Sequence, residues 1–177
     1  MNTETLLDTI NTQCDALRAR LHAAALSVSD FNKRLETILQ QLHKNIEVRD
    51  TTFAADFNLF CADLRTQVND TEVFWLQARA DVRACKAADW TEDLALPAKG
   101  LNSRARSLSR ASDEFTTAYD RFCRNYKSFT AAKLNVWLLT SCQSDLDNLT
   151  GKILFLAREI AKQTERNRGS HANGTCF

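Results

Sequence analysis

The sequence predicts an all-α protein, an elongated bundle of four to five mostly antiparallel long amphipathic helices. Two observations carry this prediction. The chain of 177 residues contains only four Gly and one Pro, where average usage would give about twelve and about nine. Folds built from β-sheets need many such residues in their turns. Apolar residues also recur at alternating steps of three and four, which is the period of one helix face.

The first half of the chain predicts three helices. Apolar residues follow the three-four rhythm from Leu7 to Leu21, and we expect this first helix to end at Ser29, a residue that can cap the next helix. The second helix should run from about 30 to 67 with a bend near Asp50. A third should start at Asn69, because Asn is a favoured N-cap and a Glu follows three residues later, as in a capping box.

The second half predicts a connection, a long helix and a shorter one. The connection covers 90–102, where the only Pro of the chain lies. The apolar pattern then continues over 101–149 and is expected to turn near Gly151, because Gly relaxes the backbone restriction at a helix end. A final helix follows. We expect one helical-bundle domain over 1–165 and a flexible C-terminal tail over 166–177.

Charge and hydropathy restrict the function classes. The net charge of +1 offers no general attraction to nucleic acid, which we do not expect as a partner. No apolar run approaches the roughly 20 residues of a membrane-spanning helix, and the N-terminus lacks a basic and then apolar signal pattern. These features favour a cytoplasmic protein, although a mature secreted chain would look the same.

The cysteines and the missing motifs argue against catalysis. Five of the six Cys lie in or beside apolar helix faces, as reduced core thiols would, while Cys176 lies in the tail; disulfides are the alternative in a secreted protein. The sequence contains no Glu-x-x-His pair, no Cys-x-x-Cys motif, no Gly-rich phosphate loop and no Gly-x-Ser-x-Gly motif. A Cys nucleophile beside His22 or His43 would need a tertiary contact. We therefore predict no catalytic, cofactor-binding or metal-binding residues, and no cofactor.

One short basic segment is a candidate phosphorylation or anion-contact turn. Its Arg and Ser side chains alternate at a predicted helix start, where an added phosphate would meet both the Arg groups and the helix N-terminus. The competing interpretation is a solvated basic turn. The residues are Arg104, Arg106, Ser107, Ser109 and Arg110.

A second basic region contains aromatic residues. Five rings between Phe115 and Phe129 alternate with Arg and Lys, an arrangement that can bind single-stranded nucleic acid by stacking. The rings are spaced by four, three, four and three residues, which places them on one helix face. We therefore interpret them as part of the core.

The predicted function is a non-catalytic helical interaction or assembly protein, with self-association as one form of assembly. Long amphipathic helices offer extended surfaces for pairing with a protein partner or with a second copy. The alternative is a membrane-acting bundle that exposes amphipathic helices on lipid; an enzyme ranks third. The candidate membrane or partner face consists of Trp137, Leu138 and Phe155.

Overall fold

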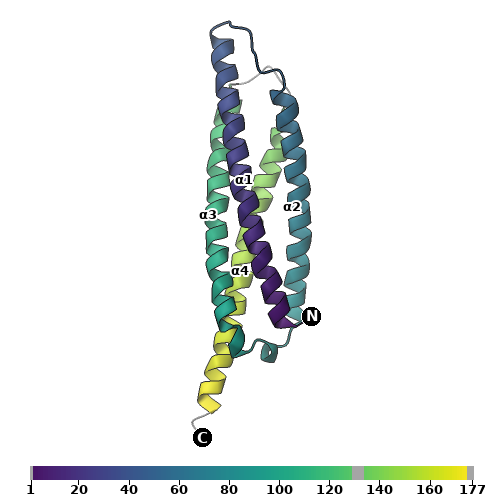
Figure 1. Ribbon diagram of the computed structural model, residues 1–177, viewed down its shortest axis with the longest axis vertical. Helices are drawn as coiled ribbons and strands as arrows, with labels where there is room; N and C mark the ends of the chain where they lie inside the picture. Colours follow the sequence, from purple (N-terminus) through teal and green to yellow (C-terminus); the bar gives the residue numbers. More distant parts are fainter. Residues whose placement is uncertain (1, 129–133, 175–177) are drawn as a thin grey trace. The chain divides into compact units, whose positions relative to one another are not determined.

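The computed structural model describes the backbone of residues 2–128 and 134–174, and the side chains of these residues up to Asn167. No strand occurs in this described backbone. The predicted all-α helical bundle is confirmed. The elements are four long helices, α1 (Thr3–His43), α2 (Phe53–Ala84), α3 (Ala95–Tyr126) and α4 (Val136–Gly174), and two short 3₁₀-helices, η1 (Ala87–Asp89) and η2 (Glu92–Leu94) (Figure 1).

Helix α1 is longer than predicted, and the expected end at Ser29 is wrong. The helix continues because Val28 and Leu35 are both fully buried and extend the same apolar face. The actual end has a clear local cause. Asn45 adopts a positive φ of 52°, and the Ile46 amide donates to the Gln41 carbonyl over 2.9 Å. This is the six-to-one hydrogen bond of a Schellman motif, with Asn at the left-handed position.

Helix α2 does not start at Asn69. The prediction of a helix start there is wrong, because Val68 and Trp75 are buried on one continuous face. The Asn69 side chain accepts hydrogen bonds of 2.9 and 2.7 Å from the Arg65 guanidinium instead of capping a new helix. The bend expected near Asp50 is a full break, since α1 ends before it and α2 begins after it.

The connection predicted for 90–102 is shorter at its C-terminal end. Helix α3 begins at Ala95, and Pro97 lies in its first turn. The missing amide hydrogen of Pro has no helical acceptor in a first turn, so Pro is tolerated there.

The boundary between the last two helices was also predicted wrongly. The pattern over 101–149 does not form one helix, because α3 ends at Tyr126 and α4 begins at Val136. The turn expected near Gly151 lies inside α4. Helix α4 also continues to Gly174, through most of the segment predicted as a tail; residues 175–177 lie outside the described residues.

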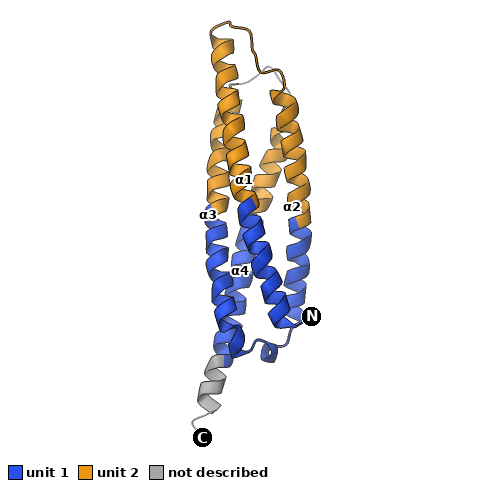
Figure 2. Ribbon diagram, viewed as in Figure 1, with its two compact units in different colours: residues 1–19, 71–110, 148–177 blue, residues 20–70, 111–147 orange. Residues whose placement is uncertain are grey.

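The chain divides into two compact units (Figure 2). Each unit takes a segment from all four long helices and has buried side chains of its own. Unit 1 consists of Met1–Ala19, Thr71–Arg110 and Asn148–Phe177. Unit 2 consists of Arg20–Asp70 and Ala111–Asp147.

Unit 1 has a mostly aliphatic core. Two Trp side chains join it, one from α2 and one from the connection between α2 and α3. Leu, Ile and Ala side chains supply most of the remaining buried surface. The largest buried members are Leu7, Ile10, Trp75, Trp90, Leu101, Leu108, Ile153 and Ile160.

Unit 2 has an aromatic core. The rings of Phe57 and Phe122 stack with centroids 4.8 Å apart and an interplanar angle of 8°, and Phe31 meets Phe57 edge-on at 5.5 Å. Phe115 is also buried. The interpretation of the aromatic run as core is therefore confirmed for Phe115 and Phe122, whereas Phe129 lies outside the described residues.

Hydrogen bonds within unit 2 define the direction of α4 against α3. The Tyr119 hydroxyl lies 2.7 Å from the Thr140 hydroxyl, and Gln143 donates to Thr116 over 3.1 Å. From the first pair to the second, the residue on α4 lies later in the sequence (Thr140, then Gln143), whereas the residue on α3 lies earlier (Tyr119, then Thr116). These two helices are therefore antiparallel, as predicted.

Candidate functional site

The basic segment predicted as a turn is helical. Arg104 lies well inside α3, so no helix N-terminus is available beside it. Its guanidinium donates to the Asp15 carboxylate at 3.0 and 3.2 Å and to the Asn11 side chain at 3.3 Å. Arg104 thus joins α3 to α1 within unit 1, and its predicted position in a turn at a helix start is wrong.

The remaining residues of this segment stay on the helix surface. Arg106 and Arg110 are exposed, whereas Ser107 and Ser109 are half-buried. A kinase or an anion would therefore meet a regular helix rather than a turn. The role of these residues in phosphorylation or anion contact stays a prediction.

The residues predicted as a membrane or partner face are exposed to different degrees. The exposed fraction of Trp137 is 70% and that of Phe155 is 60%, while Leu138 is half-buried. Trp137 and Leu138 belong to unit 2 and Phe155 belongs to unit 1.

The described part of unit 1 contains a pocket that the sequence did not reveal. It lies between the end of α2, the connection that follows it, and α4, with a volume of about 410 Å³. Its lining comes from two segments that lie 65 residues or more apart in the sequence, so only the folded chain brings them together. The lining residues are Val82, Arg83, Cys85, Ala87, Trp90, Phe155, Glu159, Ile160, Lys162, Gln163 and Arg166.

The connection that forms one wall of the pocket is held from two helices. The Asn167 side chain of α4 donates to the carbonyl oxygens of Ala87, over 2.6 Å, and of Trp90. The Thr3 hydroxyl of α1 donates to the Asp89 carbonyl over 2.9 Å. Trp90 is thereby fixed with only 2% of its surface exposed.

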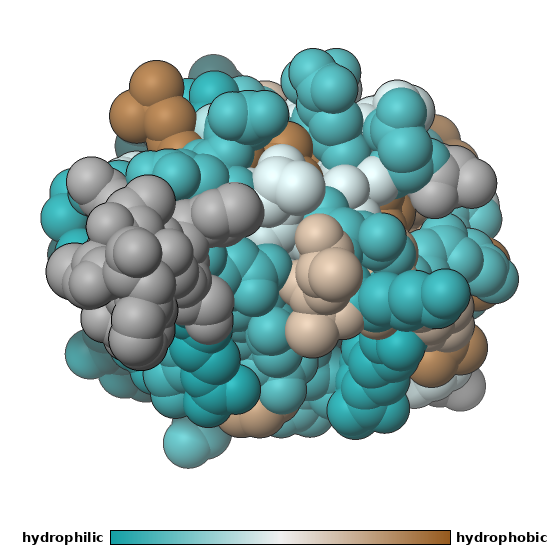
Figure 3. Space-filling view, turned by 90° about the horizontal axis from the view of Figure 1, so that it is seen from below, coloured by the Kyte–Doolittle hydropathy of each residue, from teal (hydrophilic) through white to brown (hydrophobic). Residues whose placement is uncertain are grey.

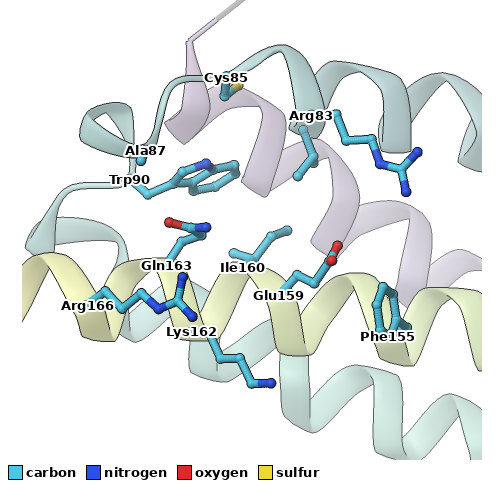
Figure 4. Close-up of a pocket in the computed structure, with 11 residues that line it drawn as sticks. Arg83, Cys85, Ala87, Trp90, Phe155, Glu159, Ile160, Lys162, Gln163 and Arg166 are labelled. Carbon is cyan, nitrogen blue, oxygen red and sulfur yellow. The ribbon is translucent and has the colours of Figure 1, made fainter.

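Positive charge dominates the lining of the pocket. Arg83, Lys162 and Arg166 contribute three cations, and Glu159 contributes the single carboxylate. Figure 4 shows the Arg166 guanidinium turned toward Gln163, with Arg83 and Glu159 toward the other end and the Lys162 ammonium directed away from Trp90. None of the three cations forms an ion pair with another residue that the structure describes.

The described cysteines are free thiols, and burial raises the pKa of four of them. Burial raises the pKa of Cys14 to about 11 and that of Cys61 to about 12. In the pocket, burial and then the nearby Asp89 and Asp81 raise the pKa of the Cys85 thiol. A raised pKa keeps a thiol protonated and weakens it as a nucleophile.

The predicted burial of the cysteines is only partly right. Three of the five described Cys are buried, whereas Cys85 and Cys123 are half-buried. Cys176 lies outside the described residues. His22, considered as a partner for a Cys nucleophile, lies instead 3.3 Å from the Glu114 carboxylate in unit 2.

Helix α2 carries an exposed apolar stripe in unit 1. Val73 and Leu76 each expose 69% of their surface, and Ala80 and Ala84 are also exposed. The steps of three, four and four residues place all four on one helix face. This stripe was not predicted, because the three-four apolar pattern of this helix was followed along one face only. A second apolar face beside the buried one was the signal that could have revealed it.

The residues that the structure describes contain neither a candidate membrane-spanning helix nor a candidate metal-binding cluster. No helix there is both long and apolar enough to cross a membrane. No group of three or more His, Cys, Asp and Glu side chains within the same residues could hold a metal ion. In comparisons with known proteins, no family model, no curated protein and no solved structure matches this chain.

Proposed function

We propose that the protein is a non-catalytic helical interaction protein, which assembles with a protein partner or with copies of itself. The observation that carries this proposal is the apolar stripe on α2, formed by Val73, Leu76, Ala80 and Ala84. Such a pattern of exposed apolar residues is the usual contact surface of a helix that pairs with another helix.

The energetics favour covering this stripe. Complete burial of a Val or Leu side chain contributes about 1.5 to 3 kcal/mol, and Val73 and Leu76 are both 69% exposed. The two alanines allow a second helix to approach closely along the same face. The raised thiol pKa values and the absence of sequence motifs for catalysis are consistent with a binding role.

Size-exclusion chromatography with light scattering tests self-association through this stripe. The chain has a mass of 20.0 kDa, so we expect a multiple of that mass for the wild type and the monomer mass for Leu76→Glu. Leu96→Glu is the matched control, because Leu96 is a 79% exposed Leu at the start of α3 and lies outside the stripe. A wild type that stays monomeric at every concentration would exclude self-association and leave a separate protein partner.

The membrane-acting alternative rests on two exposed aromatic residues, Trp137 and Phe155. Aromatic side chains are favoured at a membrane interface. The face in Figure 3 is predominantly hydrophilic, with hydrophobic residues scattered over it. Co-sedimentation with anionic phospholipid vesicles separates the two proposals. If the protein acts on membranes, it should bind the vesicles, Phe155→Glu should weaken this binding, and Leu76→Glu should leave it unchanged.

A further inference from the structure

We propose that the pocket of unit 1 is a binding site for a small organic anion that carries a flat apolar group, such as an aromatic carboxylate, sulfonate or phosphate. This inference goes beyond the proposed assembly function. It rests on the charge, the apolar lining and the fixed wall of the pocket, and it does not depend on the apolar stripe of α2.

The size and the apolar lining suit the flat part of such a ligand. The volume of about 410 Å³ lies in the range of roughly 300 to 1,000 Å³ that is typical of small-molecule sites. Trp90 and Ile160 are buried at 2% and 1% exposure, while Phe155 exposes 60% of its surface. A planar ligand group that contacts Phe155 would remove apolar surface from water.

The charges suit the anionic part. The lining residues include three cations and one carboxylate, which gives them a formal net charge of +2. In contrast, Arg34, Arg65 and Arg104 each bind an Asp side chain at 2.7 to 3.0 Å. Arg83 and Arg166 form no ion pair with any described residue, and their planar guanidinium groups are suited to bind carboxylate, sulfonate or phosphate oxygens.

The wall of the pocket is preformed. Asn167 and Thr3 hold the backbone of the connection at Ala87, Asp89 and Trp90. A ligand therefore does not have to order this segment on binding, and preorganisation of this kind increases affinity.

Neither part of the ligand is sufficient alone. Inorganic phosphate could contact Arg83 or Arg166, which lie toward opposite ends of the pocket, but would leave the Phe155 ring in water. A neutral aromatic molecule would cover Phe155 but would leave the cations without a counter-charge. The lining therefore favours a ligand that combines both chemistries.

Fluorescence titration with 1-anilinonaphthalene-8-sulfonate, an aromatic sulfonate, tests the proposal. We expect saturable binding with one site per chain. Arg166→Gln should weaken it about three- to tenfold, because it removes one nearby cation, and Glu159→Gln should strengthen it by a similar factor. Lys152→Gln is the matched control: Lys152 is an exposed cation on α4 outside the pocket, and its removal should change the affinity by less than about twofold.

The neutral dye N-phenyl-1-naphthylamine separates the charge effect from structural damage. Its affinity should change by less than about twofold in Arg166→Gln and Glu159→Gln, whereas loosened packing would alter the binding of both dyes. In the Leu76→Glu background, Arg166→Gln and Glu159→Gln should change the sulfonate affinity by the same factors, because Leu76 lies on the stripe and not in the pocket. Equal sulfonate affinities in wild type, Arg166→Gln and Glu159→Gln would overturn the proposal, and so would ratios that disappear in the Leu76→Glu background.

Discussion

The two units differ in how their aromatic side chains pack and in where their charged side chains lie. In unit 2, the large rings pack against one another and its buried or half-buried cations are paired, as with Arg65, which donates to Ser141 over 2.7 Å and to Asp145 over 2.8 Å. In unit 1, the half-buried Arg104 is paired with Asp15 at 3.0 Å, whereas Arg83 and Arg166 are exposed, line the pocket and form no ion pair with a described residue. The pocket and the apolar stripe of α2 lie in unit 1, whereas the densest aromatic packing lies in unit 2.

Two unpaired buried atoms add to this difference. The indole nitrogen of Trp75 and the side-chain oxygen of Asn102 are buried without a hydrogen-bond partner in the described structure, and both residues belong to unit 1. An unsatisfied buried polar group costs about 1 to 3 kcal/mol. We therefore expect unit 2 to contribute more to stability per buried residue than unit 1.

The largest expected effect comes from the aromatic core of unit 2. Phe57→Ala should lower the free energy of unfolding by about 3 to 5 kcal/mol, because it removes a fully buried ring and leaves a cavity. Phe60→Ala, at a half-buried position of the same helix, should cost about 1 kcal/mol. Urea unfolding measures both values, and equal small losses would show that the aromatic cluster is not the main core.

Thiol reactivity compares the two units directly. Cys85 of unit 1 is half-buried, whereas Cys61 of unit 2 is buried and has a pKa raised to about 12. At pH 8 only about one Cys61 in ten thousand would be a thiolate. We expect iodoacetamide to label Cys85 at least tenfold faster, as measured by peptide mass spectrometry. Faster labelling of Cys61 would indicate that unit 2 opens more readily than unit 1.

Removing the polar link between α1 and the connection that follows it, in unit 2, should have a moderate, pH-dependent effect on stability. Arg34 donates two hydrogen bonds, of 2.7 and 2.9 Å, to Asp50, and the hydrogen bond from Arg34 is the largest cause of the lowered pKa of that carboxyl. Arg34→Ala should cost about 1 to 2 kcal/mol at pH 7. Arg34→Lys, which keeps the charge but loses the planar fork, should recover part of this loss.

The sign of the pH dependence follows from the lowered pKa. Asp50 contributes stability above its unfolded pKa of about 3.9, and that contribution is lost as the pH falls through the lower folded value. Unfolding experiments from pH 7 to pH 2 should therefore show wild type and Arg34→Ala converging below about pH 4. A constant difference across this range would show that Arg34 stabilises through packing on Phe31 and Phe53, whose ring centroids each lie 5.5 Å from its guanidinium.

The smallest expected effect is a gain in unit 1. Gly151 lies inside α4, and a Cβ atom added there would meet nothing within 4 Å. Gly151→Ala should stabilise the protein by about 0.5 to 1 kcal/mol, because Ala favours a helix interior. Gly100→Ala should gain less, since its Cβ would lie 2.9 Å from a nitrogen of Arg104. A loss of thermal stability in Gly151→Ala would mean that this part of α4 bends in solution.

Local sequence signals predicted that the chain is helical but misplaced most helix ends. The Ser at position 29, the Asn at 69 and the Gly at 151 are all favourable residues for a helix boundary, yet each lies inside a helix. A cap contributes about 1 kcal/mol, whereas burial of one large apolar side chain such as Leu35 contributes about 1.5 to 3 kcal/mol. Continuous burial therefore outweighed the capping signals.

The scarcity of Gly and Pro and the three-four apolar spacing were enough to predict the fold class, because both features act within a single helix. Which charged residues are paired became clear only from the folded chain. Arg104 looked available in the sequence but binds Asp15, whereas Arg83 and Arg166 gave no sequence signal and line the pocket. An ion pair between helices depends on which helices become neighbours in the fold. Its two residues lie far apart in the chain, so the local spacing of residues cannot predict it.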